Sequence, residues 1–311
     1  MMESALTHSE ESKAFVKELC FEFAEEAAFL WRLRRSAVCE PHYNLSDLLE
    51  LDNRLEAQID GLRVAREAGW EECASSFSKG RPEYFFAPSI LALESGDEKH
   101  IALILEQASV KSGAAKGVIS ALEWLSYDQA EPHIKKFLAS KDPFHQFIGI
   151  AANLGHRQDP GAYLQNAFSS PDLQLKTRAL KAVGELGGRG DTLMPGRLKD
   201  QMSAEDESSR FWAAWSLLLL GDQSALDSLS TFARNPQSPL REEALQLVLR
   251  KMDLKNALAL HRDVAKENSS QRLAVICAGI IADPALIPWL IHQMAIPALA
   301  RVAGGRLAGR F

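Results

Sequence analysis

The chain has 311 residues, of which 46% are hydrophobic and 24% charged, and its formal net charge is −6 at pH 7. This composition is typical of folded proteins, and the acidic balance argues against nucleic acid as a partner, because phosphate-binding surfaces are usually basic. The sequence lacks an uninterrupted apolar run of about 18 residues and begins with a polar, acidic segment, so it predicts neither a membrane span nor a signal peptide. We therefore expect a cytoplasmic protein without a membrane partner.

Residues 1–80 predict a helical cap. One helix is expected over residues 13–35, and a second between residues 42 and 70, where Asn44 or Ser46 can cap the first turn. The apolar stripe of the first helix comprises Phe15, Leu19, Phe23, Ala27, Leu30 and Leu33, with Phe21, Phe29 and Trp31 outside it. The stripe of the second helix comprises Leu48, Leu51, Leu55, Ile59, Leu62 and Ala65.

This N-terminal region is acidic. It holds 16 Asp and Glu residues against nine Lys and Arg residues, so its net charge of −7 exceeds that of the whole chain. The carboxylates expected on the outer face of the second helix are Asp47, Glu50, Asp52, Glu56 and Asp60. Two compatible interpretations remain: a solvated face of a capping element, since terminal repeats need caps, and a docking surface for a basic partner.

A repeat of 31 residues extends over residues 83–294. One column of the repeat holds small or β-branched residues: Ser89, Ser120, Ala151, Ala182, Ala213, Ala244 and Val275. Eight or nine positions later, a second column holds aspartates: Asp97, Asp128, Asp159, Asp191, Asp222, Asp253 and Asp283. A period between 20 and 50 residues indicates a solenoid, in which each unit buries its apolar face only against its neighbours.

Each unit is predicted to be a pair of helices. In residues 210–235 the first helix is apolar on nearly all sides, Gly221 ends it, and Asp222 can cap the second helix. Leu226, Leu229 and Phe232 then continue the apolar stripe. The same scheme applies to residues 119–139, 148–168, 179–202, 244–265 and 273–294.

The small column, the Gly-Asp turn and an early arginine together resemble the HEAT repeat. The arginines at this position are Arg178, Arg210, Arg241 and Arg272. The resemblance implies an all-α, right-handed α–α superhelix with seven HEAT-like repeats over residues 81–297 behind the N-terminal cap. It also implies a ladder between the arginine and aspartate columns in the last four units. Residues 298–311 are expected to begin an incomplete further repeat or to form a tail.

A second resemblance concerns the N-terminal region. The run His42-Tyr43-Asn44-Leu45, followed by Leu51-Asp52, Arg54-Leu55, Asp60-Gly61-Leu62 and Ala65, is similar to the N-terminal signature of a bacterial HEAT-repeat family. Genes of that family often lie beside type VI secretion clusters. The resemblance implies protein partners such as a secretion spike, adaptor or effector, and it supplies no catalytic residues.

Residues that could carry chemistry are scattered. The eight histidines form no HExxH motif, the four cysteines form no CxxC pair, and the GGRGD run at residues 187–191 lacks the lysine of a P-loop. Trp124, Trp212 and Trp215 are expected in first helices as core residues, and Trp289 near the end of the array is a candidate exposed contact. We therefore predict no catalytic residue, cofactor or metal.

The sequence thus favours a non-enzymatic protein-binding scaffold or adaptor, with a role in type VI secretion implied by the resemblance. The alternatives are a groove-based enzyme like the HEAT-like DNA glycosylases or lyases, and an immunity protein that binds one toxin. The C-terminal end of the array has no polar cap, so we expect another copy, a partner or further residues to cover it.

Overall fold

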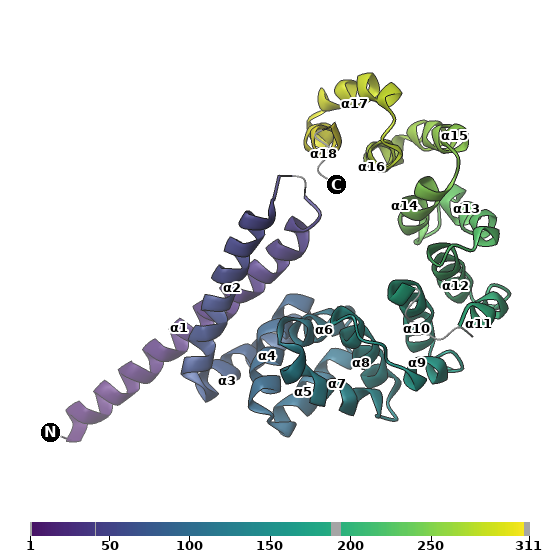
Figure 1. Cartoon of the computed structure of the whole chain (residues 1–311). Coiled ribbons are helices and arrows are strands. Elements are labelled where there is room, and N and C mark those ends of the chain that lie inside the picture. Colours follow the sequence, from purple (N-terminus) through teal and green to yellow (C-terminus); the bar gives the residue numbers. More distant parts are fainter. Residues whose placement is uncertain (1, 41, 188–193, 308–311) are drawn as a thin grey trace. The chain divides into compact units, whose positions relative to one another are not determined.

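A computed structural model describes residues 2–40, 42–187 and 194–307 of the chain (Figure 1). All regular elements in these ranges are helices, which confirms the predicted all-α class. Helices that follow one another in the sequence also contact one another, which is compatible with a superhelix. Asp191 and most of the GGRGD run lie outside the described residues.

The N-terminal region contains three α-helices and two short 3-10 helices. These are α1 (Met2–Ala37), α2 (Leu45–Ala65), α3 (Glu67–Ser75), η1 (Ser76–Lys79) and η2 (Pro82–Phe85). Of the two predicted candidates, Asn44 caps α2, because its side chain accepts hydrogen bonds from the backbone N–H groups of Ser46 and Asp47. The second predicted helix was too long, since the backbone turns at Arg66 and α3 begins as a separate helix.

The apolar stripe predicted for α1 is only partly correct. Ala27 and Leu30 are buried, whereas Phe15 is 65% exposed and Leu19 is also exposed. Trp31 was placed outside the stripe but is buried, because its ring stacks on Phe86 of α4 with a centroid separation of 5.9 Å. The core-facing side of α1 is therefore set by where α2, α3 and α4 lie against it.

The rest of the chain is a series of helix pairs. The first pairs are α4 (Phe86–Ser95) with α5 (Glu98–Ser109), α6 (Ala115–Trp124) with α7 (Tyr127–Leu138), and α8 (Pro143–Gly155) with α9 (Ala162–Ala167). The later elements are α10 (Leu173–Leu186), α11 (Met194–Gln201), α12 (Glu207–Leu219), η4 (Gln223–Ala225), α13 (Leu226–Arg234), α14 (Arg241–Lys251), α15 (Leu254–Ala265), η5 (Asn268–Ser270), α16 (Gln271–Ile281), η6 (Pro284–Leu286), α17 (Ile287–Met294) and α18 (Pro297–Leu307).

Two compact units make up the chain, and the main division between them falls within the first turn of α10. The first unit comprises Met1–Cys39 and Tyr43–Leu175, and the second comprises Glu40–His42 and Lys176–Phe311. Within the first unit, α1 packs directly on the elements that follow residue 80: besides the stacking of Trp31 on Phe86, the Tyr84 hydroxyl donates a hydrogen bond to Glu25 over 3.2 Å.

The column of small residues is mostly buried. Ser89, Ala182, Ala213, Ala244 and Val275 have no exposed surface, but Ser120 and Ala151 are only half-buried. In those two units the next residue, Ala121 or Ala152, is fully buried instead. The repeat is therefore not in strict register, and the buried small position shifts by one residue in α6 and α8.

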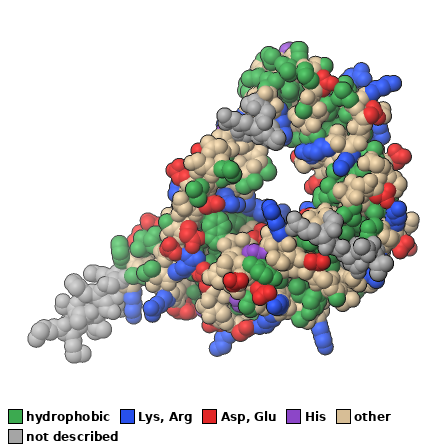
Figure 2. All heavy atoms as spheres, in the orientation of Figure 1, with side chains coloured by type: hydrophobic (Ala, Val, Ile, Leu, Met, Phe, Trp, Pro, Cys, Tyr) green, Lys and Arg blue, Asp and Glu red, His purple; other side chains and the backbone are tan. Residues whose placement is uncertain are grey.

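Several large hydrophobic side chains remain on the surface. On α17, Ile287, Ile291 and Met294 are all exposed. Figure 2 shows hydrophobic side chains gathered over the segment that Figure 1 labels α17. Contiguous exposed apolar surface of this kind marks interaction sites in proteins.

Candidate functional site

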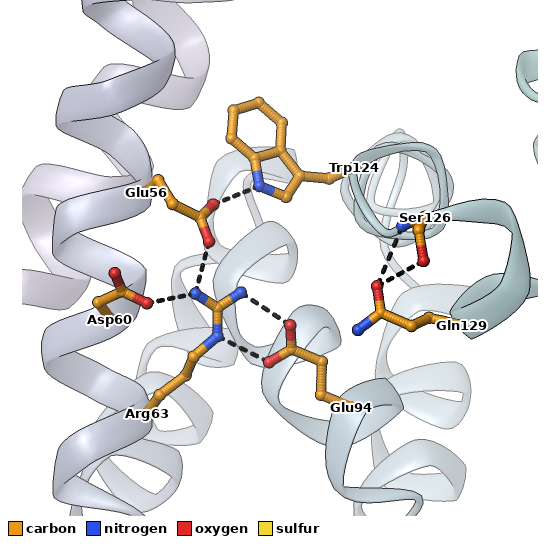
Figure 3. Close-up of polar contacts among 7 residues, drawn as sticks. All are labelled: Glu56, Asp60, Arg63, Glu94, Trp124, Ser126 and Gln129. Atoms are coloured by element: carbon orange, nitrogen blue, oxygen red, sulfur yellow. Dashed lines mark hydrogen bonds and ion pairs between the residues drawn. The ribbon is translucent and has the colours of Figure 1, made fainter.

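Arg63, in the last turn of α2, is the centre of a polar cluster in the first unit (Figure 3). Its guanidinium donates two hydrogen bonds of 2.7 Å to the carboxylate of Glu94 on α4. Its Nη1 atom donates to Glu56 and to Asp60, each over 2.6 Å. The hydrogen bond to Glu94 is the main cause that raises the pKa of Arg63 above its ordinary value.

The cluster extends to α6 through Trp124. The indole Nε1 of Trp124 donates a 2.6 Å hydrogen bond to the second carboxylate oxygen of Glu56. The guanidinium of Arg34, on α1, lies 5.6 Å from the Trp124 ring and also donates to Asp52. Charged and aromatic groups from α1, α2, α4 and α6 are therefore tied together.

These contacts change the interpretation of the acidic face predicted on α2. Asp52, Glu56 and Asp60 are paired with arginines of the same chain, and Asp47 accepts a hydrogen bond from the backbone of Asn44. Of the five carboxylates, all in the described part of the chain, only Glu50 has no hydrogen bond or ion pair. The face is thus mainly structural, although three carboxylates around Arg63 leave an excess of negative charge.

A recess of about 500 Å³ opens beside the cluster, between the α2–α3 junction and the α4–α5 turn. Its charged lining carries both signs: Arg63, Arg66, Glu67, Glu94, Asp97 and His100. The His100 ring stacks on Trp70 with a centroid separation of 3.8 Å, and its Nε2 atom lies 3.9 Å from the carboxylate of Glu67.

Arg66 stands at the edge of this recess in an unusual backbone conformation. Its φ and ψ angles are +52° and −119°, a region that is strongly disfavoured for residues with a Cβ atom. Strained residues of this kind cluster at ligand-binding sites. Neither Arg66 nor the recess could be predicted from the sequence, because an arginine within a helical pattern gives no signal of a positive φ angle.

Among the described members of the aspartate column, Asp97, Asp159, Asp222, Asp253 and Asp283 lie in the connections between helices, but not always as a helix cap, and Asp128 lies in the first turn of α7. Asp97 and Asp253 cap α5 and α15, and Asp222 and Asp283 cap the short helices η4 and η6. The prediction of a cap is wrong at Asp128, because Ser126 caps α7, and at Asp159, whose carboxylate accepts a hydrogen bond from Gly161 within the turn.

Asp222 has a strongly acidic carboxyl group. Hydrogen bonds from the Ser224 hydroxyl and from Lys199 lower its pKa to about 2. The Lys199 ammonium lies 2.9 Å from this carboxylate, so the pair joins α11 to the turn before α13. The aspartates thus stabilise the connections between helices.

The ladder between the arginine and aspartate columns is not present among the described residues. Arg178 pairs with Glu185, Arg210 donates to the carbonyl oxygens of Ala204 and Glu205, and Arg241 binds Glu267 through two hydrogen bonds. The exposed Arg272 has no hydrogen bond in the described part of the chain. The prediction fails because the aspartate oxygens are used by backbone N–H groups of their own turns.

The three tryptophans that were expected in the core are less buried than predicted. Trp124, Trp212 and Trp215 are half-buried, and the ammonium of Lys181 lies 4.7 Å from the Trp212 ring and 5.9 Å from that of Trp215. Trp289 is also half-buried and packs edge-on against the buried ring of His261, at 4.8 Å. Trp289 therefore contributes to packing within the second unit, rather than standing free as a contact residue.

Groups suited to catalysis or metal binding are sparse. Within the described ranges, no three His, Cys, Asp or Glu side chains converge on a site that could hold a metal ion. Cys73 and Cys277 are buried, and burial raises the pKa of each thiol to about 12, which disfavours the reactive thiolate. None of the described helices is both long and apolar enough for a membrane span.

Comparison with known proteins adds no relative. No protein-family model matches the chain, and no curated protein matches its sequence.

Proposed function

We propose that this protein is a non-enzymatic scaffold or adaptor that binds other proteins. The observation that carries the proposal is the recess beside Arg63, whose lining presents carboxylates, guanidinium groups and an imidazole on one open surface. A mixed-charge surface suits a partner with complementary charged side chains, because electrostatic complementarity guides association and selects the partner.

The placement of the recess also supports a binding role. It lies where the N-terminal helices meet the first helix pair, so residues from four helices contribute to it. Arg63 is held by three carboxylates, which fixes the wall of the recess before any partner arrives. Preorganised surfaces lose less conformational entropy on binding.

The class of partner is proposed from the resemblance of the N-terminal run to a HEAT-repeat family encoded near type VI secretion genes. We propose a cytoplasmic accessory role, in which the partner is a spike, adaptor or effector protein. An immunity protein that binds one toxin would use the same kind of surface, and the identity of the partner distinguishes these two roles.

The test is affinity purification of the tagged chain from its native host, followed by mass spectrometry and a binding measurement with the purified partner. Glu67→Arg reverses a charge at the mouth of the recess, where the side chain is 69% exposed, and should weaken binding about tenfold or more. Glu50→Arg is the matched control, because Glu50 is exposed on α2 but does not line the recess.

Two outcomes would contradict the proposal. One is the absence of any partner that is recovered reproducibly with the wild-type chain. The other is a partner whose affinity is unchanged by Glu67→Arg. This result would show that the partner binds elsewhere on the protein and not at the recess.

One observation favours a second candidate function, a groove that binds nucleic acid. The cluster formed by Trp212, Trp215 and Lys181 combines half-exposed aromatic rings with a cation, as single-strand binding surfaces do. Glu185, however, contacts both Lys181 and Arg178, which offsets their charge. Quenching of tryptophan fluorescence by a single-stranded oligonucleotide, lost in Trp212→Ala, would support this alternative over the scaffold.

A further inference from the structure

The outer face of α17 is apolar. Ile287, Ile291 and Met294 repeat at helical spacing and are 43%, 57% and 42% exposed. None of the eight residues of α17 carries an acidic, lysine or arginine side chain. A helix that faced only water would carry charged residues on its outer side, so this face requires a covering surface.

The charge around this face indicates what could cover it. Residues 284–307 contain no Asp or Glu, and exposed Arg301 lies on α18, which packs against α17. Arg301 has no ion pair or hydrogen bond among the described residues. A suitable occupant is therefore an apolar surface with acidic groups.

The first unit of the same chain carries such a surface. On α1 a hollow of about 590 Å³ is lined by Phe21, Phe23 and Phe29 together with three glutamates and Gln58 of α2. Phe21 and Phe29 remain 47% and 45% exposed. The rings thus present an apolar floor with carboxylates beside it.

The glutamates of this hollow are not all neutralised. Glu25 pairs with Lys79 and Glu26 with Arg54, but Glu22 has no partner among the described residues. The contact with Lys79 also shows how a cation binds here, because its ammonium lies 5.7 Å from the Phe21 ring while it pairs with Glu25. The hollow therefore suits apolar side chains that are accompanied by a cation.

We propose that two copies of this chain associate head to tail, with the α17 face of one copy covering the α1 hollow of the next. Ile291, the most exposed of the three α17 residues, enters the phenylalanine hollow, and Arg301 lies toward the unpaired carboxylate of Glu22. Because the two contacting surfaces differ, the contact is heterologous and leads to a closed ring or a growing chain. This association goes beyond the binding of other proteins and does not depend on it.

The experiment is sedimentation of the purified full-length chain over a range of concentrations. The wild type should form concentration-dependent oligomers, whereas Ile291→Asp (tail variant) and Phe29→Asp (head variant) should each raise the dissociation constant about tenfold or more. Both side chains are substantially exposed, so circular dichroism should show each variant folded. Val110→Asp, at an exposed site outside both surfaces, should behave as the wild type.

Mixing the two variants decides the geometry. The tail variant keeps an intact α1 hollow (the head), and the head variant keeps an intact α17 face (the tail). These two surfaces can still bind each other, so the mixture should form a one-to-one dimer that does not grow further. A wild-type chain that stays monomeric at every concentration overturns the proposal. A head variant that still self-associates also overturns it, because this result indicates a tail-to-tail contact. A mixture of the two variants that remains monomeric overturns it as well.

Discussion

At the scale of single residues, Arg66 shows how one backbone angle divides a helix. The apolar pattern continues through this position, yet φ of +52° ends α2 at Ala65 and starts α3 at Glu67. The turn also places Arg66 and Glu67 on the edge of the recess. The local conformation is therefore held by the packing of α2 and α3 rather than by the preference of arginine.

Replacement by glycine should relieve this strain. Arg66→Gly is expected to stabilise the fold by about 1 kcal/mol, because glycine adopts a positive φ without steric cost while losing some entropy on folding. Urea denaturation monitored by circular dichroism measures the change. Arg32→Gly, inside α1, should have the opposite sign and destabilise by about 1 kcal/mol; destabilisation by both variants would contradict the assigned conformation.

His261 is the buried titratable group with the clearest consequence for stability. It is 3% exposed, and neither ring nitrogen forms a hydrogen bond with the other residues that the structure describes. Burial lowers the pKa of this imidazole, so the folded state favours the neutral form. As the pH falls below about 6.5, His261 therefore binds a proton more readily in the unfolded chain than in the folded one. The free energy of unfolding decreases progressively as a result.

We expect the melting temperature of the wild type to fall by a few degrees between about pH 7.5 and pH 5.5 through this group. In His261→Leu that part of the pH dependence should be absent, whereas His292→Gln, at an exposed position, should keep it. Differential scanning calorimetry across this range provides the measurement. Equal pH dependence in the wild type and His261→Leu would show that the imidazole does not titrate as argued.

At the scale of elements, α10 and α12 of the second unit approach each other closely at Gly184 and Ser216. The Gly184 N–H donates to the Ser216 hydroxyl over 3.2 Å, and that hydroxyl donates to the carbonyl oxygen of Leu180 over 2.7 Å. A Cβ atom on Gly184 would lie 2.9 Å from the Ser216 Cα atom. The helices are therefore held together by a polar contact that only a glycine permits.

Gly184→Ala should destabilise the protein by about 1–3 kcal/mol, because the new methyl group forces α10 and α12 apart. Gly196→Ala is the matched control: it lies within α11, its Cβ would meet nothing within 4 Å, and the change should stabilise by about 0.5–1 kcal/mol. Thermal unfolding of the two variants tests the contrast. A neutral Gly184→Ala would mean that the crossing is looser than the contacts indicate.

Ala213 tests the repeat more directly. It belongs to the small column and has no exposed surface on α12. Ala213→Leu should therefore overpack the helix stack and cost about 1–3 kcal/mol in chemical denaturation. Ala151→Leu should cost less, since Ala151 is only half-buried in α8; equal losses at both positions would argue that the small column is not what limits the packing.

At the scale of the whole molecule, stability should be local. Contacts join mainly helices that are close in sequence, and in such stacks each unit depends chiefly on its neighbours. The damage done by Ala213→Leu is therefore expected to stay in the second unit. Hydrogen exchange measured by mass spectrometry should show faster exchange across α12 and its neighbours, with little change from α1 to α6. Uniformly faster exchange would instead indicate a single cooperative core.

The all-helical class, the paired helices and a cap at Asn44 or Ser46 could be predicted from the sequence, because these depend on local signals: apolar spacing, a glycine turn and a side chain that binds nearby backbone N–H groups. The structure decided for Asn44. The turn aspartates followed the same logic. The aspartate column alone predicts the wrong capping residue where another side chain caps the helix, as Ser126 does for α7.

The tertiary structure alone decided which polar groups are used and which surfaces stay open. Glu56 and Asp60 on a helical face look identical to solvated carboxylates until Arg63 and Trp124 are found beside them. The recess and the α1 hollow likewise depend on residues distant in sequence. The physical reason is that helix formation and capping act over a few residues, whereas charge pairing and burial depend on the neighbours that packing brings together.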